Sequence, residues 1–225
     1  MDTAQKSGKA CVLVSGGIES SVLLWDAASR YESVTPVYVQ NHLRWEYAEL
    51  FCLKNFLRHL KSDKLKTLKV IDLPINDLYG THWSITGTKV PGANSKDEDV
   101  YLPGRNIALL AKVAIFAALQ DIPSIEIGVL KSNPFSDGSK AFFAKISEVL
   151  SLGLNKEITV TAPFLKYRKE EVIMMGKRIP LEFTFSCINP KGYEHCGECN
   201  KCVERKKGFF AVGVFDKTKY KKAGI

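Results

Sequence analysis

Near its N-terminus the chain reads Val12-Leu13-Val14-Ser15-Gly16-Gly17-Ile18-Glu19-Ser20-Ser21. The apolar run over 10–14 has the length and valine content of a buried strand, and the pattern after the glycines predicts a helix over 20–31. Two glycines allow a tight turn, and the first N–H groups of a helix are free to bind an anion. This order of elements favours a phosphate or pyrophosphate site, although an ordinary strand-to-helix turn with a serine cap is the alternative.

Alternating strands and helices follow this stretch. Apolar patterns predict strands at 34–39, 68–73, 124–129 and 159–162, and helices at 46–60, 107–120, 139–154 and 169–177. Such an alternation is typical of an α/β fold with a doubly wound parallel sheet, Rossmann-like in outline, whose ligand lies beyond the carboxyl ends of the strands. The polar segment 76–100 is predicted to be a long loop over that site.

Length and composition limit the class of protein. The chain has 225 residues, of which 45% are hydrophobic, so we expect one α/β domain over 1–180 and a small module over 181–225. The sequence contains no apolar run long enough for a transmembrane helix, and residues 1–6 lack the apolar core of a secretion signal. The cytoplasm is therefore the expected location.

The net charge of +8 suits an anionic ligand such as a nucleotide or a nucleic acid. Most of the basic residues are scattered, apart from those around Lys206 and the tail Lys217, Lys219, Lys221 and Lys222. An ordinary basic surface with a frayed tail explains this pattern equally well. Binding of tRNA is possible but not expected.

Polar residues follow the later strands and begin the later helices. Arg105 and Asn106 come after a Pro-Gly turn at the start of a predicted helix, where a guanidinium can clamp a phosphate or a carboxylate. A structural arginine that binds local carbonyls is the alternative. Gly128 closes the strand over 124–129, and the loop 131–138 after it is predicted to contact the substrate.

The C-terminal part contains the most specific pattern in the chain. Cys187, Cys196, Cys199 and Cys202 give the spacing Cys-x8-Cys-x2-Cys-x2-Cys. Four thiolates at such spacing form closed structural Zn²⁺ sites, and an iron–sulfur cluster is the alternative. We predict one zinc ion, with the charges of Lys201, Arg205 and Lys206 offsetting that of the thiolates, and with His195 not needed as a ligand. Cys11 and Cys52 lie in apolar contexts and are expected in the core.

The Ser-Gly-Gly stretch resembles the pyrophosphate loop (PP-loop) of the N-type ATP pyrophosphatases, with Glu19 at the position of an aspartate. Together with Tyr38-Val39-Gln40, Glu46, Pro103-Gly104-Arg105-Asn106, Gly128-Val129 and the four cysteines, it makes nearly the whole chain similar to the 7-cyano-7-deazaguanine synthase family. The loop alone is common to many pyrophosphatases. Its combination with Pro-Gly-Arg-Asn and the cysteine spacing is much narrower.

The resemblance implies an ATP-dependent ligase of queuosine biosynthesis that works as a homodimer with Mg²⁺. ATP would adenylate the carboxylate of 7-carboxy-7-deazaguanine, ammonia would give the amide, and a second activation would give the nitrile. The resemblance further implies roles for three sets of residues. The catalytic set is Ser15, Glu19, Ser20, Arg105, Lys166 and Arg168; the ATP-binding set is Val14, Ser15, Gly16, Gly17, Ile18, Glu19, Ser20, Ser21, Arg105, Asn106 and Gly128; the substrate-binding set is Gln40 and Asp137.

The chain departs from the family pattern at two places. Glu19 is one methylene longer than the usual aspartate, and the segment 133–140 replaces the family's Tyr-Pro-Asp-Cys-Arg loop. Two alternatives therefore stay open. One is a related adenylating enzyme that acts on another acceptor, such as a tRNA base or a protein. The other is a zinc protein that binds a nucleotide without turnover.

Overall fold

The computed structural model describes residues 8–221. Its centre is a five-stranded parallel sheet in the order β3-β2-β1-β4-β5, formed by β1 (Lys9–Leu13), β2 (Ser33–Gln40), β3 (Lys69–Asp72), β4 (Ser124–Glu126) and β5 (Thr159–Thr161). The predicted doubly wound sheet is confirmed. The strand order reverses between β1 and β4, and ligands of such sheets bind at this switch point.

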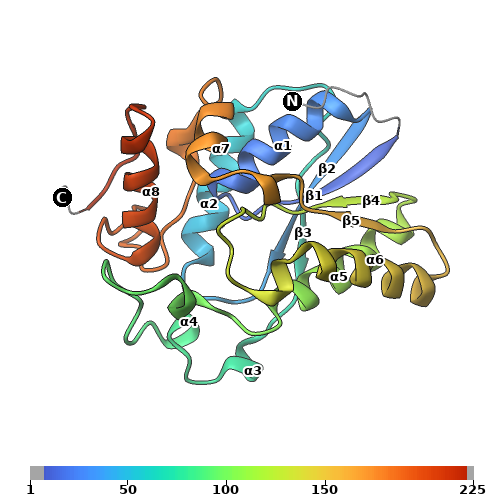
Figure 1. Cartoon of the computed structure of the whole chain (residues 1–225), viewed down its shortest axis with the longest axis horizontal. Helices are drawn as coiled ribbons and strands as arrows, with labels where there is room; N and C mark the ends of the chain where they lie inside the picture. Colours follow the sequence, from blue (N-terminus) through green and yellow to red (C-terminus); the bar gives the residue numbers. More distant parts are fainter. Residues whose placement is uncertain (1–7, 222–225) are drawn as a thin grey trace.

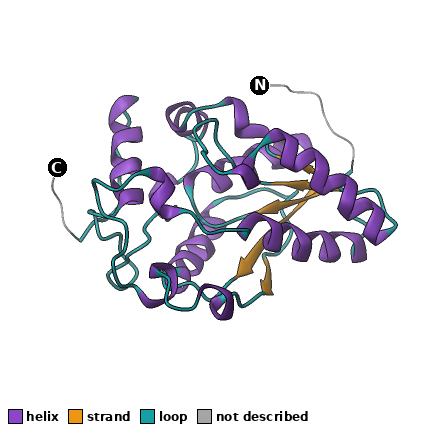
Figure 2. Ribbon diagram, turned by 60° about the horizontal axis from the view of Figure 1, so that its bottom comes forward, coloured by secondary structure: helices purple, strands orange, loops and turns teal. Residues whose placement is uncertain are grey.

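Helices cover both faces of the sheet (Figures 1 and 2). On one face lie α1 (Ile18–Arg30), α2 (Glu46–His59) and α7 (Lys169–Met175), which share a core cluster containing Val22, Phe56 and Val172. On the other face lie α5 (Arg105–Leu119) and α6 (Lys140–Leu154), which pack on the sheet through a second cluster containing Val113 and Phe143. The side chains of a strand alternate between its two faces, so β2 contributes Tyr38 to the first cluster and Val37 and Val39 to the second.

The predicted elements are found with shifted ends. Helix α1 begins at Ile18 rather than at residue 20, and α5 begins at Arg105 rather than at 107, so the arginine is the first helical residue. Strand β4 ends at Glu126 rather than at 129. The loop predicted over 76–100 contains the short helices α3 (Asn76–Tyr79) and α4 (Trp83–Thr86) and the 3-10 helix η1 (Asp97–Val100).

Three further 3-10 helices complete the elements: η2 (Ser136–Gly138), η3 (Pro163–Lys166) and η4 (Leu181–Phe183). They lie in connections after β4, β5 and α7. The turn of η2 buries Asp137.

The cysteine-rich part is followed by a helix that sequence reasoning did not predict, α8 (Asn200–Ala211). A third cluster joins the four cysteines to Leu43, Trp45 and Leu102 from the α/β part of the chain. Phe209 of α8 enters the cluster shared by α1 and α7. Residues on both sides of the predicted boundary at 180 therefore pack together.

Residues 1–6, on which the expectation about a secretion signal depends, and Lys222 of the basic tail lie outside the described residues. Over 8–221, the model contains no helix of the length and hydropathy that crossing a membrane requires.

Candidate nucleotide and acceptor site

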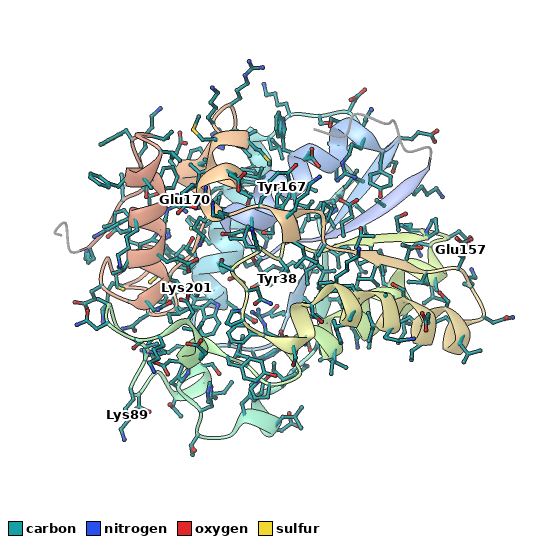
Figure 3. The ribbon with its side chains drawn as sticks, viewed as in Figure 1. Tyr38, Lys89, Glu157, Tyr167, Glu170 and Lys201 are labelled. Carbon is teal, nitrogen blue, oxygen red and sulfur yellow. The ribbon has the colours of Figure 1, made fainter. Side chains whose placement is uncertain are left out.

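A cavity of about 380 Å³ lies beyond the carboxyl ends of the strands, at the switch point between β1 and β4. Its lining comes from the loop after β1, from the segment 97–106, from the segment 127–137 and from α7 and α8. Figure 3 shows Tyr38 near the middle of the molecule, Lys201 to its left on the side of α8, and Glu157 at the right, beyond the opposite ends of the strands. This is where the topology predicts a ligand.

The Ser-Gly-Gly loop, residues 15–20, is held by its own serines. Ser20 Oγ accepts a hydrogen bond from Ser15 N at 3.1 Å and lies 3.2 Å from Ser15 Oγ, which in turn accepts from Gly17 N at 3.3 Å. The N-cap of α1 is Gly17, and among the described residues no side chain caps this end of the helix. The first N–H groups of α1 therefore remain available to an anion, and the helix dipole favours negative charge there.

Two glycines are required at this loop, one by its backbone conformation and one by a close backbone approach. Gly16 has a φ of 78°, a left-handed conformation that other residues seldom adopt. A Cβ at Gly128 would lie 3.0 Å from Ser20 N and 3.1 Å from the carbonyl carbon of Glu19. Gly128 thus lets the segment after β4 pack directly against the start of α1.

A chain of four charged side chains crosses the cavity wall. Lys169 Nζ lies 3.0 Å from Glu19 Oε1 and 2.6 Å from Glu204 Oε1, and Lys201 Nζ lies 2.8 Å from Glu204 Oε2. Burial disfavours the charged form of Lys169, but Glu19 and Glu204 outweigh it and hold the lysine's pKa above its ordinary value. Despite its own burial, Glu204 has its pKa lowered to about 2 by Lys169 and Lys201. Lys169 and Glu204 are therefore charged at neutral pH.

Arg105 and Asn106 line the cavity at the start of α5. Asp137 caps this helix from a distant loop, because its Oδ2 accepts from Asn106 N at 3.2 Å and its carbonyl accepts from Asn106 Nδ2 at 2.9 Å. Among the described residues, Nε of Arg105 is buried without a hydrogen-bond partner. The guanidinium thus has a donor available to a ligand, while the carboxylate of Asp137 is already engaged.

The two sides of the cavity differ in chemistry. The α5 side is apolar, with Leu13, Val37, Val39, Leu109 and Ile127, all members of the core cluster beneath α5 and α6. An uncharged aromatic ring such as adenine fits such a surface.

The opposite side, here called the acceptor side, carries Trp45, Glu49, Trp83, Phe185 and Ser186. The rings of Trp45 and Trp83 stack with centroids 5.5 Å apart.

Two buried glutamates of α2 shape the acceptor side. The carboxylate of Glu46 accepts from Asn41 N at 2.9 Å and from His42 N at 2.8 Å, and it thereby holds the turn in which His42 has a φ of 63°. Glu49 Oε1 accepts from the Tyr38 hydroxyl at 2.9 Å. Burial raises the pKa of Glu49 to about 8, although Arg105 and hydrogen bonds from Tyr38 and Trp45 act in the opposite direction.

The structure brings most of the predicted site residues together. Nine of them line the cavity: Val14, Ser15, Gly17, Glu19, Ser20, Arg105, Asn106, Gly128 and Asp137. Gly16 lies between two of these residues in the loop but is not part of the lining. Ile18 and Ser21 are buried in the first turn of α1, on the side of the core.

Gln40, Lys166 and Arg168 are not part of the cavity lining. Gln40 ends β2, where its carbonyl accepts from Leu73 N, whereas Lys166 and Arg168 have exposed side chains. Sequence reasoning missed Lys169, one position beyond Arg168, because nothing in the run Lys-Tyr-Arg-Lys distinguishes the cation that folds inward. It also missed Glu49 and Glu204, which look like ordinary surface positions of helices.

The four cysteines of the C-terminal part form one cluster. Cys187, Cys196, Cys199 and Cys202 are buried, and their sulfur atoms all lie within 4.8 Å of one another, so they could hold a metal ion. Backbone N–H groups point at the sulfurs, with Asn189 N and Cys196 N each 3.3 Å from Cys187 Sγ. Such donors stabilise thiolates, the form in which cysteine binds a metal.

The groups around the cysteines are engaged elsewhere. His195 Nε2 accepts from Ser186 N at 3.0 Å, and burial lowers the pKa of His195 to about 3, so the ring is neutral. Arg205 is fully buried and bonds Asp216, Thr184 and the carbonyl of Leu181, which ties the C-terminal segment to η4. Lys206 donates a hydrogen bond of 3.0 Å to the carbonyl of Gly197, between Cys196 and Cys199.

Comparison with known proteins supplies the family. Residues 9–213 match the family model described as Queuosine biosynthesis protein QueC. The chain belongs to this family. A 7-cyano-7-deazaguanine synthase from Nitratiruptor sp. is 32% identical over 95% of this chain and 99% of its own length. One from Methanocaldococcus jannaschii is 28% identical over 94% of this chain and 99% of its own length.

Two solved structures resemble the chain at low sequence identity. A predicted subunit of tRNA methyltransferase from Methanocaldococcus jannaschii is 16% identical with a TM-score of 0.48, over 75% of this chain and 74% of that one. A 4-thiouridine synthetase solved with RNA and ATP is 18% identical with a TM-score of 0.46, over 92% of this chain and 50% of that one. At these scores neither likeness bears on the site.

Proposed function

We propose that this protein of the QueC family is an ATP-dependent carbon–nitrogen ligase that acts on 7-carboxy-7-deazaguanine. ATP adenylates the carboxylate and releases pyrophosphate; ammonia then displaces AMP and gives the amide. A second ATP activates the amide oxygen, and loss of AMP leaves the nitrile 7-cyano-7-deazaguanine. The names of the relatives support this substrate, since two of them are called 7-cyano-7-deazaguanine synthase over nearly their whole length.

One observation carries the proposal. In a chain of this family, the uncapped start of α1, the cation Lys169 and the guanidinium of Arg105 line a single cavity. An adenylation reaction must stabilise the negative charge that builds on the departing pyrophosphate. Backbone N–H groups and fixed cations at that point lower the barrier because they need no reorganisation as the charge develops.

Each part of the cavity lining has its own role in this reaction. The N–H groups of the Ser-Gly-Gly loop hold the pyrophosphate, and the apolar α5 side accepts the adenine. Lys169, fixed between Glu19 and Glu204, faces the β and γ phosphates, while Arg105 bonds the α-phosphate or the acceptor carboxylate. Mg²⁺ bound with ATP would share the phosphate charge, and Glu19, in the Ser-Gly-Gly loop, would be a carboxylate available to hold it. No protein nucleophile is needed, because ammonia is the nucleophile.

The metal of the cysteine cluster is proposed to be one structural zinc ion. With Zn–S bonds of about 2.3 Å, a tetrahedral site separates its sulfurs by about 3.8 Å. The Cys187–Cys199 and Cys196–Cys202 sulfur pairs lie 3.8 Å and 3.9 Å apart. Four thiolates leave no open position, so the ion would stabilise the fold rather than take part in the reaction. A homodimer in the cytoplasm is the assembly and location that we propose, on family resemblance alone.

The test is one incubation of the purified protein with ATP, Mg²⁺, ammonium and 7-carboxy-7-deazaguanine. Mass spectrometry should detect AMP together with the amide and the nitrile. If AMP does not form above the level without the acid, the proposed substrate is wrong. In that case a library of other carboxylates, tRNA and protein acceptors can be screened with the same AMP measurement.

A second candidate is adenylation of a different acceptor, such as a tRNA base or a protein. The observation that favours it is the engagement of Asp137, whose carboxylate caps α5 instead of standing free for a substrate. The segment 133–140 therefore presents a different surface from the family's substrate loop. Release of AMP that depends on tRNA or on a protein, and not on the deazaguanine acid, would support this candidate.

A further inference from the structure

The acceptor side of the cavity contains an acid that the adenylation steps do not use. Glu49 lies on α2, is only 7% exposed, and lines the cavity together with Tyr38 and Trp45. It makes no ion pair within residues 8–221, and the Tyr38 hydroxyl at 2.9 Å holds one of its oxygens in place. Arg105 favours the charged form of Glu49 but forms no ion pair with it within the described residues, so the burial of this carboxyl at the cavity wall is costly and needs an explanation.

The position of Glu49 separates it from the nucleotide. The apolar α5 side of the cavity, with Val37 and Val39, is the side proposed for adenine. Tyr38 is turned to the other face of β2, and its hydroxyl reaches α2 there. Glu49 therefore lies toward the opposite face of β2 from the side proposed for adenine, where it faces the compound that receives the adenylyl group.

Hydrogen-bonding chemistry selects what this carboxyl can bind. Once ionised, a carboxylate only accepts, and its two oxygens match two neighbouring N–H donors. Burial raises the pKa of Glu49 to about 8, so a ring with two such donors binds with release of the carboxyl proton. The edge of a guanine-type ring offers such a pair, the ring N–H and the exocyclic 2-amino group. An adenine edge places an acceptor nitrogen beside its amino group and would repel the carboxylate. The stacked pair Trp45 and Trp83 lies on the same side and offers an aromatic surface for a planar ring.

From these contacts we infer that Glu49 is the residue that selects a guanine-type heterocycle, accepting the ring N–H and the 2-amino N–H of the acceptor while Tyr38 holds its carboxylate in place. This inference rests on the proposed function, since it concerns the acceptor of the same reaction. Glu49 is thus a specificity residue, and Tyr38 is a positioning residue. Binding sites that bury a hydrogen-bonding group reject ligands without the partner group, since that group is then left unpaired.

The experiment compares two ligands and three variants by equilibrium binding. The ligands are 7-carboxy-7-deazaguanine and 7-carboxy-7-deazahypoxanthine, which lacks only the 2-amino group. Isothermal titration calorimetry measures each Kd for the wild type, for Glu49→Gln and for Tyr38→Phe. The matched control is Glu148→Gln, an exposed glutamate of α6. The affinity for a non-hydrolysable ATP analogue is measured in every variant to show that each one is folded.

The wild type should prefer the ligand with the 2-amino group by about tenfold or more. Glu49→Gln should weaken binding of that ligand by about 10- to 100-fold and remove most of the preference, because the amide places an N–H against a donor. Tyr38→Phe should weaken binding of the ligand with the 2-amino group several-fold and should keep part of the preference for that group. Glu148→Gln should match the wild type, and the ATP analogue should bind all four proteins equally.

Other outcomes have separate meanings for the inference and for the proposed function. If Glu49→Gln keeps the wild-type preference, or if the wild type binds neither heterocycle, the inference is wrong. If the wild type shows the expected preference but releases no AMP with the deazaguanine acid, the inference stands and the proposed reaction is wrong. If AMP is released while Glu49→Gln keeps the preference, the reaction stands and another residue selects the ring.

Discussion

Lys169 Nζ lies 3.0 Å from Oε1 of Glu19, so the loop at the start of α1 is joined to α7 by an ion pair within the cavity wall. Glu204 of α8 holds the same ammonium at 2.6 Å. The lysine is therefore fixed between the Ser-Gly-Gly loop and the cysteine-rich part. Its side chain is 12% exposed, which limits it to ligands that enter the cavity.

We predict that Lys169→Met lowers the rate of AMP release by about 100-fold or more, a loss of the size seen when one fixed transition-state contact is removed. The variant also leaves Glu19 and Glu204 without their buried cation, so it should unfold at a lower temperature. Lys145→Met, at an exposed position of α6, is the matched control. Full activity in Lys169→Met would show that this ammonium does not contact the phosphates.

The sequence predicts Lys166 and Arg168 as catalytic cations, whereas the structure places Lys169 in the cavity, and variants of all three distinguish these predictions. Both side chains are exposed and outside the cavity lining, so we expect Lys166→Met and Arg168→Met each to change the rate of AMP release by less than Lys169→Met does. Steady-state kinetics of the three variants under the same conditions measure the order. If Arg168→Met gives the largest loss, the cation at the phosphates is Arg168 and the exposed conformation is not the active one.

Glu19→Ala should abolish AMP release, whereas Glu19→Asp should retain part of it. The aspartate keeps the charge, but its shorter side chain lengthens the contact with Lys169 and weakens it. Formation of AMP from ATP with each variant measures both effects. Unchanged ATP consumption in Glu19→Ala would instead favour a nucleotide-binding protein in which the loop takes no part in turnover.

Asp137→Ala should raise the KM for ATP by about tenfold with a smaller change in kcat. The carboxylate caps α5 at Asn106 N, and losing a cap typically costs about 1 kcal/mol and loosens the first helical turn, where Arg105 lies. Initial rates at varied ATP concentration measure the two constants. A change in the KM for the acceptor alone would show that Asp137 acts on the substrate rather than through α5.

The raised pKa of Glu49 should make the free energy of unfolding depend on pH. Burial raises the pKa of Glu49 from an ordinary value of 4.5 to about 8, so between these pH values the folded protein binds more protons than the unfolded chain. The free energy of unfolding should then fall as the pH rises from 5 to 8, by at most about 1.4 kcal/mol per pH unit from this group. Urea titrations at several pH values should give a flatter profile for Glu49→Gln.

The neighbours of Glu49 are the same in both proteins, so they cancel in this comparison. They are Tyr38 on β2, Glu46 on α2 and Arg105 on α5. Equal slopes for the wild type and Glu49→Gln would mean that the carboxyl is ionised throughout this range.

The cysteine cluster should contain about one zinc ion per chain by elemental analysis. Removing the metal with a chelator, or introducing Cys199→Ser, should impair folding more than turnover, since the binding free energy of a structural metal contributes to folding. The cluster also holds part of the cavity wall, because Asn200 N donates to the carbonyl of Pro91 at 3.1 Å and Asn200 Nδ2 to that of Ser95 at 2.9 Å. Hydrogen exchange over 91–100 should therefore rise when the metal is removed. If the analysis instead finds iron, and the protein shows a visible charge-transfer band, the site holds an iron–sulfur cluster and the zinc assignment is wrong.

The sequence by itself determined the fold class and the location of the loop that starts it. Apolar runs of strand length alternate with helical patterns, and this order leaves few arrangements other than a doubly wound parallel sheet. The Ser-Gly-Gly stretch could be placed at the start of α1 because a glycine turn between a strand and a helix has a known geometry. The cysteine cluster could also be predicted from the sequence, because cysteines at short spacings lie close together whatever the rest of the fold.

Only the tertiary structure decided which charged side chains share the cavity. Lys169 and Glu204 are separated by 35 positions in the sequence, and nothing local distinguishes Lys169 from Lys166 and Arg168. Of these three cations, Lys169 at the start of α7 is the one that pairs with Glu19 of the Ser-Gly-Gly loop. Likewise, the capping of α5 by Asp137 and the bond from Tyr38 to Glu49 join elements that are distant or differently oriented. Local patterns record the period of a helix or a strand, whereas contacts between elements depend on how their faces pack.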